Sequence, residues 1–167
     1  MSIGQYDYSG LCEAFVNQSQ PSGKTAEGRM SFNQLSVYSY NSLLATLDPA
    51  NKVLLIDNYI AKYSSTSQGH LKVLLECATE FTIYLIYLDH EPEDNLIDYF
   101  NRVQSSISRF RRARVRMFGH RTLTLKHYAE MQSYLLYLNL DRRTKVYKLA
   151  KQREQTIFAT LIEHQIL

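Results

Sequence analysis

The chain is poor in the residues that stabilise small secreted domains and in the runs that span membranes. Its 167 residues include two cysteines, Cys12 and Cys77, three prolines, six glycines and no tryptophan. Two cysteines so far apart in sequence give no disulfide framework, which favours a reducing compartment. The longest apolar run, Phe81 to Leu88, has eight residues, whereas a membrane span needs roughly 18. We expect no signal peptide and no membrane partner.

The remaining composition is that of an ordinary globular chain. Apolar residues make up 45% and charged residues 21%, and a chain of this length buries roughly 68–70% of its unfolded surface. Thirteen tyrosines suit half-buried strands and binding faces, because tyrosine combines an apolar ring with a polar tip. Residues 1–30 are polar and rich in turn formers, which is typical of a loop or of disorder. We therefore expect a flexible segment over 1–30 and a single α+β domain over 31–167 with a basic helical C-terminal half.

Residues 32–63 are predicted to form antiparallel strands. Apolar and polar residues alternate from Leu35 to Tyr40 with the period of a strand. Proline, aspartate and asparagine in Asp48 to Lys52 favour a turn before Val53 to Ile56, which predicts a hairpin. The run Phe81 to Leu88 is rich in Thr, Ile and Tyr and is predicted as a buried strand, with a continued helix as the alternative.

Helix signals fill most of the remaining chain. Ser64 to Ser67 precede an apolar run, which is an N-cap pattern. Acids and Pro92 open an amphipathic helix, whose apolar face steps by four and three through Leu96, Phe100, Val103, Ile107 and Phe110. Two further helices are expected over 124–138 and 142–163, the second capped by Asp141. The predicted fold is α+β, a small antiparallel sheet packed against three or four helices.

Charge is distributed unevenly along the chain. Residues 1–101 carry five Lys/Arg and twelve Asp/Glu, a net charge of −7, whereas residues 102–167 carry fourteen and four, a net charge of +10. The total of +3 conceals this asymmetry. Such a division indicates a polyanionic partner, or an acidic region that faces a basic one.

Arginines dominate the basic half. From Arg112 to Met117 they alternate with apolar residues, so we expect a strand that ends at Gly119 and places Arg112, Arg114 and Arg116 about 6.6 Å apart on one face. Guanidinium groups in a row suit phosphates or carboxylates. The alternatives are a solvated face and internal pairing with the acids of 89–98. The candidate residues for binding nucleic acid or an acidic partner are Arg102, Arg109, Arg111, Arg112, Arg114, Arg116, Arg121, Arg142, Lys145 and Lys148.

A second candidate site lies at the predicted helix start. Its hydroxyls and imidazole, from Ser64, Thr66, Ser67 and His70, suggest either an anion site or a nucleophile with its base. The structural alternative is a helix cap whose hydroxyls bond to the turn backbone. No acid at a diagnostic spacing orients His70, so no catalytic residue is assigned.

Metal and cofactor motifs are not seen in the sequence. The five histidines show no i, i+4 pairing, and the two cysteines are isolated. His120 and His127 are two helical turns apart, but Gly119 argues against a continuous helix between them. There is no Walker loop, no GxGxxG and no zinc-finger spacing. We expect neither a metal nor a cofactor, and a protein that is not an enzyme.

Part of the chain resembles a family. Ser39 to Ala45, Val53 to Ile56 and Tyr63 to Leu71 resemble small proteins of tailed bacteriophages, in which a Ser-Tyr step precedes a hairpin and a Tyr-Ser-x-Thr-Thr/Ser-x-x-His segment opens a helix. The chain has Ser67 and Leu71 where that pattern has Thr and Gln. The resemblance covers about residues 34–75 and implies a virus-encoded protein in the host cytoplasm. It carries no function and does not extend to the arginine-rich half.

Three functional hypotheses follow. The first is a non-enzymatic protein that engages nucleic acid through the arginine-rich surface. The second is an effector that binds a host protein or nucleoprotein complex of the defence or transcription machinery, by gripping an acidic surface or by mimicking nucleic acid with the 89–98 acids. The third is an enzyme that acts on a phosphate-containing substrate near His70. The tyrosine-rich strands also leave a homo-oligomer open.

Overall fold

The computed structural model describes residues 4–59, 64–113 and 117–167. The chain divides into two compact units, residues 1–89 and residues 90–167, whereas the sequence suggested one domain from residue 31 onward. We call them the sheet unit and the helical unit. The fold class is α+β, as predicted: a mixed, mostly antiparallel sheet of seven strands and five helices over the described residues.

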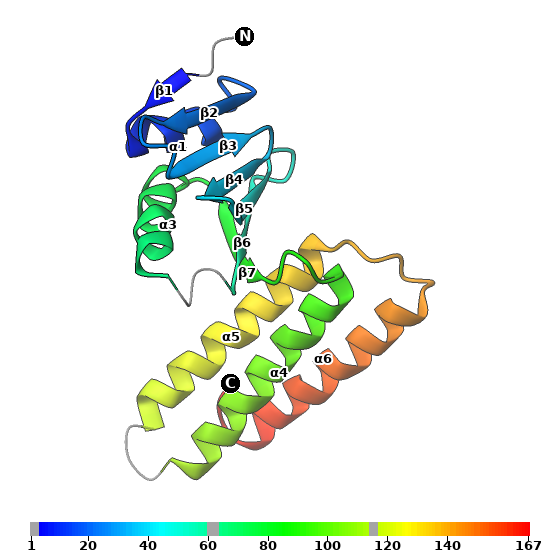
Figure 1. Ribbon diagram of the computed structural model, residues 1–167. Coiled ribbons are helices and arrows are strands. Elements are labelled where there is room, and N and C mark those ends of the chain that lie inside the picture. Colours follow the sequence, from blue (N-terminus) through cyan, green and yellow to red (C-terminus); the bar gives the residue numbers. More distant parts are fainter. Residues whose placement is uncertain (1–3, 60–63, 114–116) are drawn as a thin grey trace. The chain divides into compact units, whose positions relative to one another are not determined.

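The sheet unit has its seven strands in sequence order (Figure 1). β1 pairs with β2 in parallel, β2 to β6 form an antiparallel meander, and β6 pairs with β7 in parallel. Each parallel pair needs a crossover, which α1 and α3 provide. The strands are β1 (Gly4–Tyr6), β2 (Ser22–Thr25), β3 (Met30–Asn33), β4 (Ser36–Ser39), β5 (Ser42–Asp48), β6 (Val53–Asp57) and β7 (Thr82–Ile86), and the helices are α1 (Tyr8–Val16) and α3 (Ser65–Cys77).

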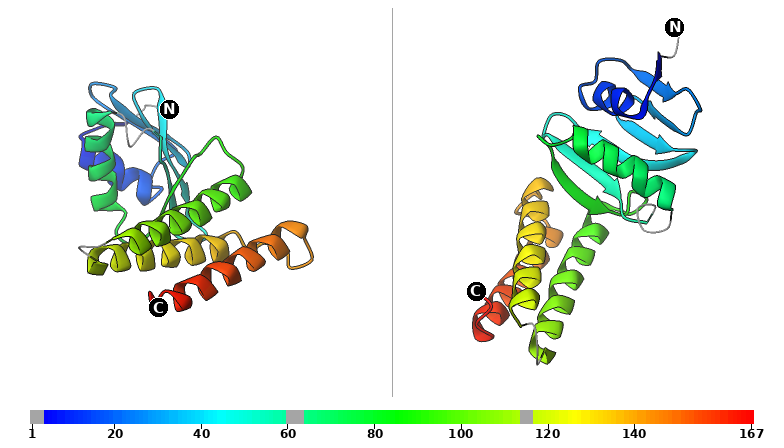
Figure 2. Two further views of the ribbon diagram at one scale, coloured as in Figure 1. Left: turned by 90° about the horizontal axis from the view of Figure 1, so that it is seen from below. Right: turned by 90° about the vertical axis from the view of Figure 1, so that its left-hand side faces the viewer.

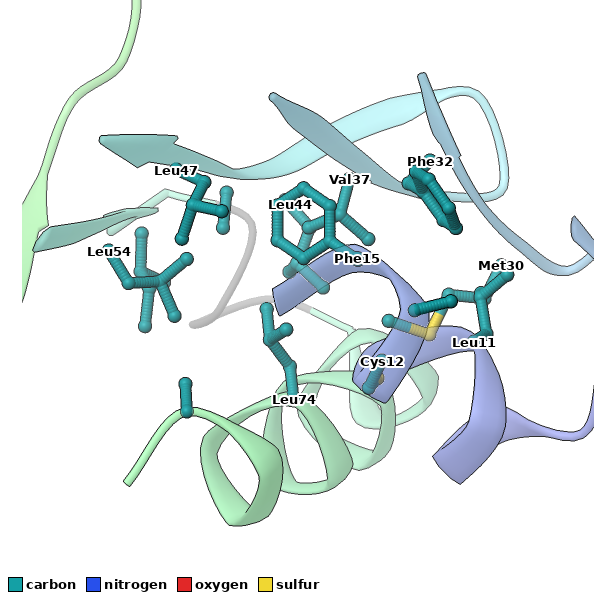
Figure 3. Close-up of a cluster of buried hydrophobic side chains, with 14 residues drawn as sticks. Leu11, Cys12, Phe15, Met30, Phe32, Val37, Leu44, Leu47, Leu54 and Leu74 are labelled. Atoms are coloured by element: carbon teal, nitrogen blue, oxygen red, sulfur yellow. The ribbon is translucent and has the colours of Figure 1, made fainter. Parts of the chain in front are cut away.

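Both helices cover the same face of the sheet, and the core lies between them and the strands (Figure 3). Phe32, Val37 and Ala45 are register partners in successive strands, so their side chains share this face. Phe15 of α1 and Leu74 of α3 meet them from the helical side and are fully buried. A β-bulge in the β4–β5 pair shifts the register, which lets adjacent Leu44 and Ala45 both be buried.

The predicted strands and hairpin are confirmed as strands, but β7 is not buried as predicted, because it lies at the edge of the sheet with Ile83 and Leu85 exposed. The N-terminal segment and the size of the sheet also differ from expectation. Residues 4–30, expected to be loop or disorder, form β1, α1, β2 and the start of β3. Leu11 and Phe15 form an apolar pair at i, i+4 in this segment. Their short helix is stable because a sheet covers that face. The sheet is therefore larger than predicted, and five helices replace the expected three or four.

The helical unit contains α4 (Pro92–Arg112), α5 (Met117–Tyr137) and α6 (Lys145–Glu163), shown from two further sides in Figure 2. Contacts fix their directions. Tyr99 packs on Tyr134 and Ser106 bonds to His127, so α4 and α5 are antiparallel. Gln132 bonds to Glu154, and Arg121 donates to the carbonyl of Ile166, so α5 and α6 are also antiparallel. It follows that α4 and α6 run in the same direction.

Helix α4 forms as its sequence predicts. Pro92 occupies the first turn with Glu93 and Asp94, and basic residues fill the last turn, so its charges complement the helix dipole at both ends. Of the predicted apolar face, Leu96, Phe100, Val103 and Ile107 are buried, and Phe110 is half-buried. In the described residues, no helix is both long and apolar enough to span a membrane.

Other boundaries in this unit were wrong. Arg112 is the last residue of α4, so it does not begin a strand; Arg114 and Arg116 lie outside the described residues. Gly119 lies inside α5 and does not end an element. The α6 cap is Thr144, whose hydroxyl accepts from the Tyr147 N–H (3.1 Å), while Asp141 accepts from the Arg143 N–H (2.9 Å).

Candidate nucleic-acid interface

Three cations from two helices converge on His127. Arg102 and Arg109 lie two turns apart on one flank of α4, and Lys126 lies on α5. Partial burial lowers the pKa of His127 most, and Arg102, Lys126 and Arg109 lower it further, whereas only Glu130 raises it. Lys126 forms an exposed i,i+4 ion pair with Glu130 (3.8 Å). Three cations and one acid therefore act on the His127 ring. We call Arg102, Arg109, Lys126 and His127 the α4–α5 basic surface.

A hydrogen bond fixes the orientation of the His127 ring. Nδ1 lies 2.6 Å from the hydroxyl of Ser106, which is buried in the α4–α5 interface. That hydroxyl also contacts the carbonyl of Arg102 at 3.0 Å. Because a carbonyl only accepts and a serine has one proton, the hydroxyl donates to the carbonyl of Arg102 and His127 donates to the hydroxyl.

His120 and His127 both lie in α5, so the prediction that no continuous helix joins them was wrong.

Apart from Arg102, the described candidate cations lie at two ends of the helical unit. Arg109, Arg111 and Arg112 are exposed at the C-terminal end of α4, and Arg121 is exposed near the N-terminal end of α5, at the same end of the hairpin. The candidates Arg142, Lys145 and Lys148 are exposed around the start of α6, at the opposite end. Among the candidates that the structure describes, the cations therefore form two basic groups rather than a single row.

The arginines at the C-terminal end of α4 lie far from the acids at its start. Asp94 and Arg109 are fifteen residues apart on one continuous helix, which separates their levels by roughly 22 Å. Across the described residues, neither Glu93 nor Asp94 forms an ion pair with Arg109, Arg111 or Arg112. The acids instead occupy the first turns of α4, where they complement the dipole.

The second candidate site is occupied by structural contacts. Ser64 caps α3 by accepting from the Ser67 N–H (3.2 Å). Ser39 of β4 bonds to the Ser67 hydroxyl (3.0 Å) and to Nδ1 of His70 (2.9 Å). Ser39 is 2% exposed, and Ser67 and His70 are 5% exposed; Thr66 is exposed. The contacts of Ser64 fit a helix cap, and those of Ser39, Ser67 and His70 fit a buried polar cluster.

The buried His70 lies in an aromatic environment. Its ring stacks on Tyr8 at 5.0 Å between centroids and lies 6.1 Å from Tyr40. Burial lowers the pKa of His70, and the positive charge of Arg29 lowers it further. A neutral imidazole is therefore the stable form in this position.

Sequence reasoning missed a groove between α5 and α6. It has a volume of about 620 Å³ and is lined by aromatic and polar side chains of both helices: Tyr128, Gln132, Tyr147, Lys151, Glu154, Gln155 and Phe158. Inside it, Glu154 accepts from Lys151 (2.6 Å) and from Gln132 (3.2 Å), and Gln132 also donates to Tyr128 (3.0 Å). Burial and the Glu154 charge raise the pKa of Tyr128. These groups are satisfied by one another, so the groove does not present an uncompensated charge.

No group of three or more metal-ligating side chains occurs in the described residues. The cysteines, however, are not isolated as predicted. Cys12 of α1 and Cys77 of α3 come into contact where the two helices pack. Burial raises the pKa of Cys12 to about 12, and burial also raises that of Cys77, so neither thiol is activated as a nucleophile.

Comparison of the chain with protein-family models, with curated proteins and with solved structures finds no match. The resemblance to tailed-phage proteins over residues 34–75 therefore stays a prediction, and function is argued from the site alone.

Proposed function

We propose that the helical unit binds the phosphate backbone of nucleic acid through the α4–α5 basic surface. The observation that supports this most is that Arg102, Arg109 and Lys126 all act on the half-buried His127, while Arg109 and Lys126 are exposed. A phosphate placed there would relieve the mutual repulsion of these cations and release the counterions of the polyanion. The resemblance adds that the protein is virus-encoded and acts in the host cytoplasm.

Helix stability does not explain the whole basic set. Arg109, Arg111 and Arg112 are at the C-terminal end of α4, where each complements the dipole by about 0.3–1 kcal/mol. Lys145 and Lys148, by contrast, lie in the first turns of α6, which contain no acid, and cations there oppose the dipole. We expect an anionic partner bound near these lysines to offset the unfavourable electrostatic energy.

The distance between the two basic groups favours a polymer over a small phosphate. Helix α4 has 21 residues, a length of roughly 30 Å, and the two groups lie toward its opposite ends. Duplex DNA carries one charge per about 1.7 Å of axis, so a single nucleic acid can reach both groups. A phosphorylated small molecule can neutralise only one of them.

The test is a salt titration of oligonucleotide binding, measured by fluorescence anisotropy with single strands and duplexes. Arg109→Ala should weaken binding and reduce the slope of log K against log salt by roughly 0.9 for a duplex or 0.7 for a single strand. Arg142→Ala should act in the same way if the polymer spans both ends. Lys72→Ala, an exposed lysine of the sheet unit, is the matched control and should leave the slope unchanged.

A result that contradicts the proposal is equal binding by Arg109→Ala and wild type, or no binding at low salt. The effector hypothesis makes a different prediction, a host protein that stays bound at fixed stoichiometry after nuclease treatment of a bacterial lysate. If nucleic acid co-purifies and nuclease removes it together with all other bound material, the result supports nucleic-acid binding. The same pull-down with Arg109→Ala links the result to this surface.

A further inference from the structure

A small apolar groove is lined by residues of α4 and α6 and has one charged side chain at each end. Leu96 and Phe100 of α4 and Ala150 of α6 form its buried floor, and its volume is about 130 Å³. This is below the roughly 300–1,000 Å³ of small-molecule sites. Its rim is Ile97, Val146 and Leu149, which are 42%, 39% and 49% exposed. Projecting apolar side chains around a shallow floor are typical of a protein-binding surface.

The charges occupy opposite ends of this groove. Because α4 and α6 run in the same direction, Glu93 lies level with Val146, and Phe100 lies level with Arg153, whose guanidinium is 5.9 Å from the Phe100 ring centroid. Glu93 and Arg153 are thus about two helical turns apart along the axis, roughly 10 Å. Within the described residues neither of them forms an ion pair.

We propose that a second copy of this chain docks on the α4–α6 groove about a two-fold axis. An acid at one end, a base at the other and apolar residues between make the groove complementary to itself when it is turned end for end. In that arrangement Glu93 of each copy faces Arg153 of the other. Ile97 and Leu149 lie near the middle of the groove, so Ile97 of each copy meets Leu149 of the other across the axis, where the apolar contact of an interface is concentrated.

Other partners fit the groove less well. A uniformly basic or acidic partner would satisfy one charge and repel the other. The proposed dimer contact also does not include Arg102 and Arg109, which lie on the opposite flank of α4. The inference therefore does not depend on nucleic-acid binding, and a dimer would present two copies of the α4–α5 basic surface.

The test is the mass in solution, measured by sedimentation over a concentration series that reaches the millimolar range. Wild type should approach twice the single-chain mass of 19.5 kDa. Glu93→Arg and Arg153→Glu each place like charges at both contacts, so each alone should raise the dissociation constant at least about tenfold. An equimolar mixture of these two variants restores both ion pairs, and the mixture should dimerise as wild type does.

Matched variants separate an interface effect from a folding effect. Asp94→Arg makes the same change of charge as Glu93→Arg in the same helical turn without lining the groove. Gln152→Glu adds one negative charge next to Arg153, and both variants should dimerise as wild type does. Circular dichroism checks that every variant is folded. A monomeric wild type, dimers of the single charge reversals, or a mixture that stays monomeric would each overturn the proposal.

Discussion

The hydroxyl of Ser106 on α4 lies 2.6 Å from Nδ1 of His127 on α5. This bond attaches the imidazole at the centre of the basic surface to the helix that carries Arg102 and Arg109. The ring therefore reports on the charges around it, because its position is fixed and its pKa follows the local field.

Removing a neighbouring cation should raise the pKa of His127. In Arg109→Ala, one of the positive charges that disfavour the imidazolium is lost, so the pKa should move up toward the ordinary value. Bound phosphate should also raise it, because an anion favours the charged ring. Titration of the His127 ring proton by NMR measures both shifts. Arg143→Ala, at the opposite end of the helical unit, is the control, and an equal shift in that variant would contradict the assignment.

The buried His70 should make the protein less stable in acid. Its pKa is lowered in the folded state, so between that value and the unfolded value near 6.5 the unfolded chain binds more protons. The free energy of unfolding should therefore fall as pH falls below about 6.5 and level off below the folded pKa. Urea unfolding at a series of pH values measures this, and His70→Gln should reduce the dependence.

His127 also has a lowered pKa and adds to the same acid effect. The pH dependence that remains in His70→Gln should be reduced further in the double variant with His127→Gln. If His70→Gln unfolds with the pH dependence of wild type, the assignment of the effect to the buried imidazole is wrong.

The two thiols should react slowly and in a fixed order. Cys77 is half-buried, whereas Cys12 is fully buried with a pKa near 12, and the thiolate is the reactive form. A thiol reagent at pH 8 should label Cys77 first, and Cys12 only on unfolding. Cys77→Ser should leave a folded protein with no rapidly labelled thiol. Rapid labelling of Cys12 in that variant would show that α1 and α3 do not pack as described.

Two glycine substitutions should have opposite effects on stability. A Cβ on Gly23 would lie 2.7 Å from the buried Phe32 ring and 3.2 Å from Leu11, so Gly23→Ala should overpack the core and cost about 1–3 kcal/mol. A Cβ on Gly69 meets nothing within 4 Å, and this residue lies within α3. Gly69→Ala should therefore stabilise the protein by up to about 1 kcal/mol. Urea unfolding compares the two, and a stabilising Gly23→Ala would contradict the packing of β2 against β3.

Local patterns predicted the elements whose signals are local. The Asp48–Lys52 turn, the Ser64 cap and the apolar face of α4 depend on neighbours within a few residues, so the sequence alone indicates them. The N-terminal segment was misjudged because α1 has only nine residues, and such a short helix becomes stable only when a sheet covers it. Arg112 and Met117 were assigned to a strand, whereas they end α4 and begin α5, because a short alternating pattern does not distinguish a strand from a helix end.

The sequence by itself determined the fold class, the order of most strands and helices, and the separation of charge between the two ends of the chain. Tertiary structure alone decided which charges meet. It brought Arg102 and Arg109 of α4 near His127 of α5, and placed Arg142 and Lys145 at the far end of the same unit. It also buried Ser67 and His70 against Ser39, and it brought the free thiols of Cys12 and Cys77 into contact. The physical reason is that periodicity specifies which face of an element is buried, whereas the partner of that face depends on how the elements pack.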